Sequence, residues 1–175
     1  MLGRRRLCLL WAAAALSGCG FALRQPPQFV FRSLYLQLPE GSTLGPQLVR
    51  ALRHSPALRV LLQPSERATA DAIFEVRSEQ REKIVAGLNA AGQVREFQLR
   101  LRLRFRLITP QGRELIPETE LALQREIGFA ESAALAKEEE EALLYRDMRS
   151  DMLQQILRRL AAVASVQGGT SPLER

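Results

Sequence analysis

The sequence predicts an α+β fold: a sheet of about four mostly antiparallel strands, with two helices packed on one face. Two observations carry this prediction. Long alternating segments follow one another between residues 72 and 127, and apolar residues at helical spacing occur before and after them. Alternation with a period of two is typical of strands, and a spacing of three to four residues is typical of helices. Strands with one apolar face need a cover on that face only, so we expect the other face to be charged and exposed.

The chain begins with the pattern of a secretory signal. Arginines at positions 4–6 precede an apolar run of about ten residues, which is much shorter than the roughly 20 residues that cross a bilayer. The run ends in Leu16-Ser17-Gly18-Cys19, which resembles a bacterial lipobox. The resemblance implies that residues 1–18 are a cleaved signal peptide and that Cys19 carries N-acyl and S-diacylglycerol chains. A glycine rather than an aspartate follows Cys19, which favours the outer membrane in such lipoproteins. The alternative is a plain signal peptide with an incidental cysteine.

Cysteines and charge narrow the class of protein. The only other cysteine, Cys8, lies in the segment expected to be removed, so we predict no disulfide. The formal net charge is +6, and the signal arginines account for half of it. The remainder is too small to indicate a nucleic-acid partner, especially in an exported protein. We expect residues 19–28 to form a lipidated tether, 29–166 a single domain and 167–175 a flexible tail.

The first half of the domain predicts a strand, a helix and a short extended piece. Residues 29–38 alternate, with Val30, Leu34 and Leu36 on one face. Gly45-Pro46 starts a helix, because proline is favoured at the first helical position, and Ser55-Pro56 ends it. We expect residues 58–62 to be extended and 63–70 to form a loop.

Three consecutive strands follow, over residues 72–85, 93–107 and 114–127. The turns at 87–92 and 109–112 contain glycine, asparagine and proline where tight turns need them. In the first strand, alternation predicts a charged face that contains Glu75, Arg77, Glu79, Arg81 and Lys83. In the central strand, odd positions from 97 to 107 are apolar, and the opposite face carries Gln98, Arg100, Arg102, Arg104 and Arg106.

A long helix completes the domain, over about residues 131–166. Its apolar stripe contains Leu144, Met148, Met152, Ile156, Leu160 and Val163. Ser132 is a candidate helix cap. The four glutamates at 138–141 point in different directions on a helix, so they predict a solvated acidic stretch rather than a metal site.

The arginine ladder, which is the set Arg100, Arg102, Arg104 and Arg106, is the sharpest candidate for function. Guanidinium groups about 7 Å apart along one strand face could clamp phosphates by bidentate hydrogen bonds. The competing interpretation is structural, because the neighbouring strands offer Glu75, Glu79, Glu118, Glu120 and Glu126, which would neutralise the ladder.

The sequence does not indicate an enzyme. Its only histidine, His54, lies beside Ser55-Pro56 at a helix end, and there is no cysteine nucleophile left after processing. Gly-rich phosphate loops and metal-ligand spacings are also missing from the sequence. We therefore expect no catalytic residues, no metal and no cofactor.

Taken in order, these segments resemble the LptE family of lipopolysaccharide-assembly lipoproteins. Residues 19–24 are similar to the family's Cys-Gly-aromatic-X-Leu-Arg start, and residues 93–99 resemble the Glu-aromatic-X-Leu core of its central strand. Residues 134–138, 146–148 and 154–160 look like its final helix.

The resemblance implies a non-enzymatic outer-membrane lipoprotein that plugs and helps to assemble an LptD-type β-barrel, with which it places lipopolysaccharide in the outer leaflet. It also implies lipopolysaccharide contact near the hairpin tip and the start of the last helix. Lys137 matches the second position, whereas the tip has no basic residue and the nearest ones are Lys83 and Arg95. The alternative function is a free periplasmic lipid-binding lipoprotein, which would need an apolar cavity.

Overall fold

The computed structural model describes residues 28–130 and 134–167. Cys19 and Ser132 therefore lie outside the described residues. In chain order the elements are β1 (Ser33–Gln37), α2 (Gly45–Arg53), β2 (Arg59–Leu61), the 3-10 helix η1 (Pro64–Thr69), β3 (Ala72–Leu88), β4 (Val94–Ile108), β5 (Glu114–Gly128) and α3 (Ala134–Gln167).

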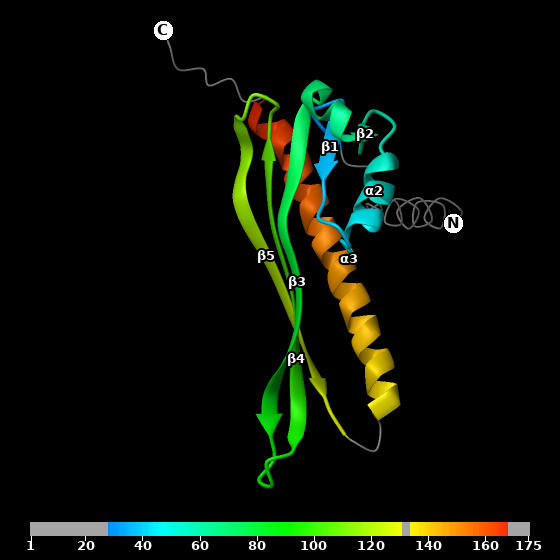
Figure 1. Ribbon diagram of the computed structural model, residues 1–175, viewed down its shortest axis with the longest axis vertical. Helices are drawn as coiled ribbons and strands as arrows, with labels where there is room; N and C mark the ends of the chain where they lie inside the picture. Colours follow the sequence, from blue (N-terminus) through cyan, green and yellow to red (C-terminus); the bar gives the residue numbers. More distant parts are fainter. Residues whose placement is uncertain (1–27, 131–133, 168–175) are drawn as a thin grey trace, which may run out of the picture.

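The strands form one sheet in the order β2-β1-β3-β4-β5, so the sheet has five strands rather than about four (Figure 1). The additional strand is β2, which lies within the extended piece expected at residues 58–62. Both pairings of β1 are parallel, while the long β3–β4 and β4–β5 pairings are antiparallel. The parallel pairings are short, so most of the sheet is antiparallel, as predicted.

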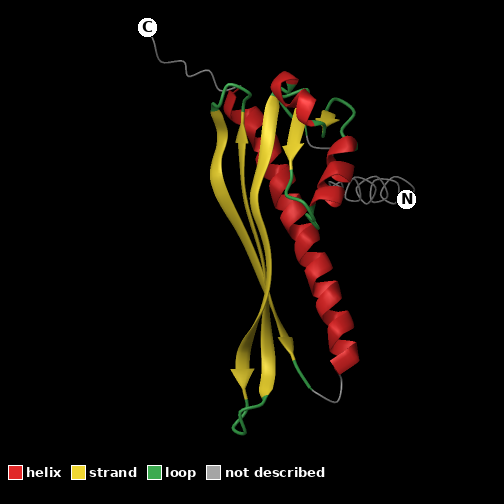
Figure 2. Ribbon diagram, viewed as in Figure 1, coloured by secondary structure: helices red, strands yellow, loops and turns green. Residues whose placement is uncertain are grey.

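Both helices cover the same face of the sheet, which confirms the predicted layering (Figure 2). The core lies between them and the apolar side chains of β4, such as Leu99, Leu103 and Phe105. From α3, Met148, Met152 and Ile156 are fully buried against these side chains. Burial of a side chain of this size contributes about 1.5–3 kcal/mol, so this stripe is a main source of stability. It also fills the space between α3 and the sheet.

The opposite face is not charged throughout. Near the start of β1 it carries a second, smaller core, made of Tyr35, Leu61, Ala70, Ile73 and Ile108. Ala70 directly follows η1, the segment that was expected to be a plain loop. The charged part of this face therefore begins only at Glu75 and extends toward the β3–β4 turn.

A β-bulge in β3 changes which side chains face the helices. The register with β4 shifts between Val76 and Ser78, so the extra residue Arg77 inverts the alternation beyond it. Glu79, Arg81 and Lys83 then lie opposite Leu103, Leu101 and Leu99 of β4, on the helix-covered face. The expectation that these three charged residues lie on the same face as Glu75 is wrong, because simple alternation does not anticipate a bulge.

Each inverted side chain holds a helix in place. The carboxylate of Glu79 accepts hydrogen bonds from Ser42 Oγ at 2.6 Å and from the backbone N–H of Leu44 at 3.2 Å. Leu44 is the N-cap of α2 and has no polar side chain of its own, so Glu79 supplies the negative charge that a helix N-terminus favours.

Arg81 and Lys83 perform the same task for α3. Both bind the carboxylate of Glu141, at 3.0 and 2.7 Å. The Arg81 guanidinium also stacks on the ring of Tyr145, 3.7 Å from its centroid, and the Tyr145 hydroxyl donates to the backbone carbonyl of Glu82 at 2.6 Å. Polar contacts thus fasten the first half of α3 to the sheet.

The strand expected at residues 29–38 is shorter than predicted. It starts at Ser33, and Val30 is exposed while Phe31 joins the main core with Leu34 and Leu36. Asp71 explains this start, because its carboxylate accepts the backbone N–H groups of Arg32 and Ser33 at 2.8 and 2.9 Å.

Candidate functional site

The arginine ladder lies along β4 on the face away from α3, where sequence reasoning expected it. Three of its members bind a carboxylate on a neighbouring strand. The nitrogen-to-oxygen distances are 3.2 Å for Arg102–Glu82, 2.8 Å for Arg104–Glu120 and 2.7 Å for Arg106–Glu75. Arg100 has no such partner within the described part of the chain, and its Nε donates to Gln98 Oε1 at 2.7 Å.

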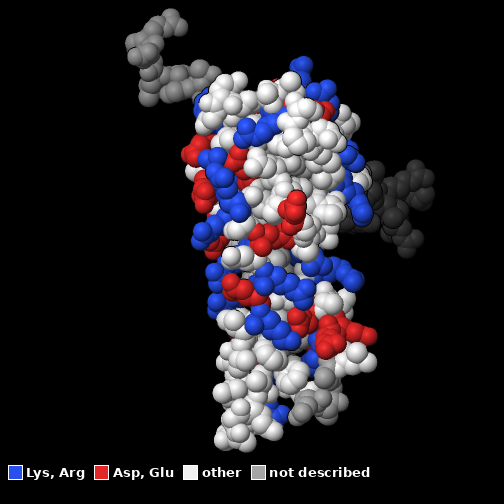
Figure 3. All heavy atoms as spheres, viewed as in Figure 1, with Lys and Arg blue, Asp and Glu red and all other residues white. Residues whose placement is uncertain are grey.

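Cross-strand neutralisation of the ladder is therefore confirmed for three arginines. Two of the carboxylate partners, Glu75 and Glu120, are among those expected, whereas Glu82 takes the place of Glu79 on this face. Figure 3 shows acidic and basic side chains side by side over the middle of the visible surface. The result is a mixed-charge face rather than a purely cationic one.

Glu75 is the most buried charged group of this face. Its side chain is 4% exposed and bonds to Arg106 and Arg67, with Arg77 at 3.6 Å. Burial alone would raise the pKa of Glu75, but the hydrogen bonds from Arg106 and Arg67 and the charges of Arg106 and Arg77 hold it below its ordinary value. Glu75 therefore stays ionised at neutral pH.

Arg100 borders a hollow of about 310 Å³ in the same face. The hollow is lined by Arg100, Arg102, Ala122, Leu123 and Gln124. A guanidinium without a carboxylate partner is free to bind an external anion, so this is where the ladder retains binding capacity.

Lys137 lies in the first turns of α3, and Lys83 reaches the same place from β3. Both line a hollow of about 150 Å³ together with Phe97, Phe129 and Glu141. Lys137 Nζ binds Glu140 at 2.7 Å, and Lys83 Nζ lies 4.4 Å from the centre of the Phe97 ring. The structure thus brings together two lysines that the sequence analysis named separately. The sequence did not predict this meeting, because the bulge in β3 is what turns Lys83 toward α3.

Because Glu141 also lines this hollow, the site is not purely basic. The side chain of Glu141 is 14% exposed, whereas Glu138, Glu139 and Glu140 are exposed, as expected of a solvated acidic stretch. Burial would raise the pKa of Glu141, but the hydrogen bonds from Lys83 and Arg81 and their charges lower it. Glu141 consequently remains a carboxylate that positions both cations.

We call the end of the sheet at the β3–β4 turn the distal end. This end carries almost no charged side chains on the visible surface (Figure 3). Several large apolar side chains are exposed here, which the sequence did not anticipate: Val85 by 51%, Leu88 by 60% and, at the start of α3, Leu135 by 74%. Single exposed apolar side chains are common on protein surfaces, so they do not by themselves indicate a binding site.

Comparison with known proteins identifies the family. The model of a family described as "LptE: Lipopolysaccharide-assembly" matches residues 31–160, which is most of the described domain. The chain belongs to the LptE family.

Named relatives agree with this membership. The "LPS-assembly lipoprotein LptE" of Yersinia enterocolitica is 29% identical over 167 residues, covering 93% of this chain and 79% of the relative. That of Pectobacterium atrosepticum is 27% identical over 162 residues, covering 92% and 86%. A solution structure of a lipoprotein B from Nitrosomonas europaea has a TM-score of 0.71 and 36% identity, covering 83% of this chain and 93% of that one.

The described part of this LptE-family chain holds no group of acidic, histidine or cysteine side chains arranged to bind a metal. Within the same residues, no helix is both long and apolar enough to cross a membrane. His54 is exposed, and its Nδ1 lies 2.7 Å from the carbonyl oxygen of Arg50, one helical turn before it.

The network around Glu75 yields a stability prediction. Glu75→Gln should destabilise this LptE-family domain by about 2 kcal/mol at neutral pH, because it weakens two charge-assisted hydrogen bonds and leaves Arg106 half-buried without its carboxylate. Since the native pKa of Glu75 lies below its ordinary 4.5, its contribution is present above that pH and is lost as the pH falls through the native value. Urea unfolding should therefore show the gap between wild type and variant narrowing on acidification.

The matched control is Glu120→Gln, which breaks an exposed ion pair of the same ladder. Arg104 and Glu120 are 57% and 39% exposed, so the cost should stay below about 1 kcal/mol. Equal effects of the two variants, or a gap for Glu75→Gln that does not change with pH, would contradict this account.

Proposed function

We propose that this chain is a non-enzymatic lipoprotein of the outer membrane that plugs an LptD-type β-barrel, assists its assembly, and acts with it to place lipopolysaccharide in the outer leaflet. Membership of the LptE family is the observation that carries the proposal. The names of its relatives, which are LPS-assembly lipoproteins, support the same role.

The surface chemistry of the domain suits a barrel lumen, which is polar. The exposed sheet face carries alternating charges that are mostly paired within the domain, so it can enter a polar lumen without presenting a large unbalanced charge. The long antiparallel strands make the domain elongated rather than spherical (Figure 2). A rigid, elongated body with a hydrophilic sheet face is a suitable shape for a plug.

We propose that Cys19 is the attachment point. With residues 1–18 removed, its acyl chains would hold the domain at the membrane through a tether of residues 19–28. One acyl chain gives only marginal binding, whereas the three chains expected on a bacterial lipoprotein make release negligible. The anchor would also keep the domain close to its barrel during assembly.

We propose that lipopolysaccharide contacts Lys137 and the arginine ladder. Lys137 shares its hollow with Lys83. The turn between β3 and β4 has no basic residue, so Lys83 would supply the second cation of the contact in its place. Within the ladder, Arg100 would bind an anion directly, while Arg102, Arg104 and Arg106 would first have to exchange their carboxylate partners.

Purification from outer membranes in a mild detergent tests the proposed function. Native mass spectrometry should show a one-to-one complex with a large barrel, and the mass of the smaller subunit should exceed that of the mature chain by the acyl groups on Cys19. Depletion of the lipoprotein should leave the barrel misassembled. A lone lipoprotein that carries lipid but no barrel would instead support the free periplasmic lipid-binding alternative.

Charge reversal of Lys137 tests the lipopolysaccharide contact. Lys137→Glu should weaken binding of purified lipopolysaccharide by about tenfold, because it replaces a charge-assisted contact by a repulsive one. Calorimetric titration measures the affinity, and circular dichroism verifies the fold. Arg146→Glu makes the same charge change at an exposed site on α3 and should bind normally. Equal affinities of the two variants would remove Lys137 from the contact.

A further inference from the structure

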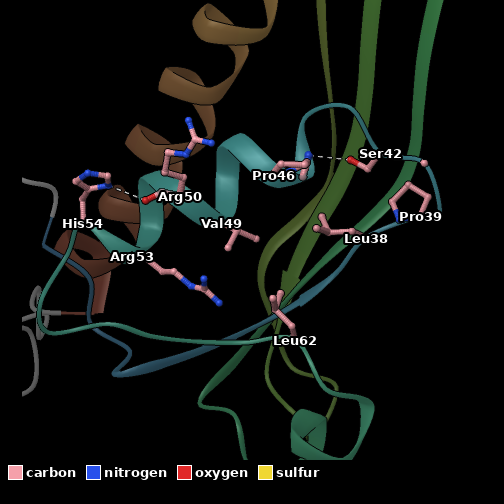
Figure 4. A pocket seen from close by; sticks show the side chains of 11 residues that line it. Leu38, Pro39, Ser42, Pro46, Val49, Arg50, Arg53, His54 and Leu62 are labelled. Atoms are coloured by element: carbon pink, nitrogen blue, oxygen red, sulfur yellow. Dashed lines mark hydrogen bonds between the residues drawn. The ribbon is translucent and has the colours of Figure 1, made fainter.

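A groove runs along α2 on the side away from the arginine ladder. Its volume is about 710 Å³, and it lies between the helix, the loop that precedes it and the residue after β2 (Figure 4). Leu38, Val49 and Leu62 give it an apolar floor, and Leu62 is 40% exposed there. Arg50 and Arg53, one turn apart on α2, form its rim; in Figure 4 the side chain of Arg53 reaches toward Leu62, whereas that of Arg50 extends to the other side of the helix.

The rim arginines differ from most of those on the sheet. Both are exposed, and neither binds a carboxylate in the described part of the chain. They follow the preference of helix C-termini for positive charge, but this leaves their guanidinium groups free to bind an anion. No acidic residue is among those that line the groove in the described part of the chain. Glu40, in the loop before α2, is the nearest one in sequence.

The groove extends from the C-terminal ends of β1 and β2, where Leu38 and Leu62 lie, to the end of α2 at His54, and only the His54 end leads toward the first described residues. Arg59, five residues after His54, donates its backbone N–H to the carbonyl of Arg32 at 2.8 Å, so the segment leaving α2 meets the first described residues. Nine residue-to-residue steps lead from Cys19 to Gln28, and they span at most about 30 Å when the segment is fully extended. An acylated Cys19 would therefore keep this end of the domain within about 30 Å of a bilayer surface.

We propose that the α2 groove docks onto anionic phospholipid headgroups at the surface of the membrane that holds the anchor. Arg50 and Arg53 bind the phosphates, and the apolar floor around Leu62 covers the upper part of an acyl chain. This combination of a cationic rim and an apolar floor matches an anionic amphiphile. The contact can be weak in itself, because the tether supplies a high effective concentration of membrane. The proposal rests on the proposed lipid anchor, but not on the barrel.

A single tryptophan provides the test. The only natural one, Trp11, lies in the expected signal peptide, so Leu62→Trp in the acylated mature protein, which begins at Cys19, places a single reporter in the groove, and the mature protein without this substitution serves as the blank. The protein is reconstituted into vesicles of zwitterionic phosphatidylcholine, with or without anionic phosphatidylglycerol, in which the acyl chains are brominated. Flotation reports the anchor, and quenching of tryptophan fluorescence by bromine reports docking.

We expect flotation with both kinds of vesicle but quenching of Leu62→Trp mainly on the anionic ones. Adding Arg50→Gln and Arg53→Gln should lower the ratio of docked to undocked protein by roughly 10- to 30-fold, while Arg50→Lys and Arg53→Lys should restore it. Arg146→Gln with Arg149→Gln removes the same charge from α3 and should have no effect. Leu143→Trp, exposed on α3, should stay unquenched.

Two results would overturn the proposal in distinguishable ways. Flotation without anionic-specific quenching, or quenching insensitive to Arg50 and Arg53, would contradict docking while leaving the anchor intact. Failure to float with either kind of vesicle would contradict the anchor and, with it, the docking that depends on it.

Discussion

The β-bulge between Val76 and Ser78 is the constraint on which the rest of this domain depends. One extra residue turns Glu79, Arg81 and Lys83 toward the helices. Glu79 then caps α2, while Arg81 and Lys83 bind Glu141 and so fix the start of α3. Because the apolar core is confined to one part of the sheet, these polar contacts hold α3 along the distal part. The same inversion leaves Glu82 on the opposite face, where it neutralises Arg102.

The two faces of the sheet thus have different roles that follow from their chemistry. The helix-covered face supplies stability by burying side chains such as Met148 and Phe105. The other face is polar, and its charges are largely balanced within the domain, so it suits a hydrated partner surface better than a lipid core. Several of the exposed apolar side chains lie at the distal end, whereas the unpaired arginines of α2 lie away from that end (Figure 1). With the proposed anchor at Cys19, this difference would give the elongated domain a defined direction relative to the membrane.

Most of the fold could be predicted from the sequence, because the alternation in β4 and the apolar stripe of α3 are long and regular. The parallel pairings of β1 could not, since three or four register pairs leave no distinct pattern in a short strand. For the site, the ladder and its neutralisation were predictable from charge alternation. The meeting of Lys83 with Lys137 was not, because a bulge has no reliable signature among charged residues such as Glu75, Arg77 and Glu79.

Site-specific photo-crosslinking from position 122 tests the central claim, that the charged sheet face meets a barrel partner, most directly. Ala122 lies opposite Arg102 and is exposed in the middle of that face, so a photoreactive amino acid there removes no charge and no ion pair. In living cells, our account predicts a crosslinked product with the mass of this lipoprotein plus one large outer-membrane barrel. Irradiation that yields no barrel adduct from position 122, in a protein that is correctly folded and membrane-bound, would contradict it.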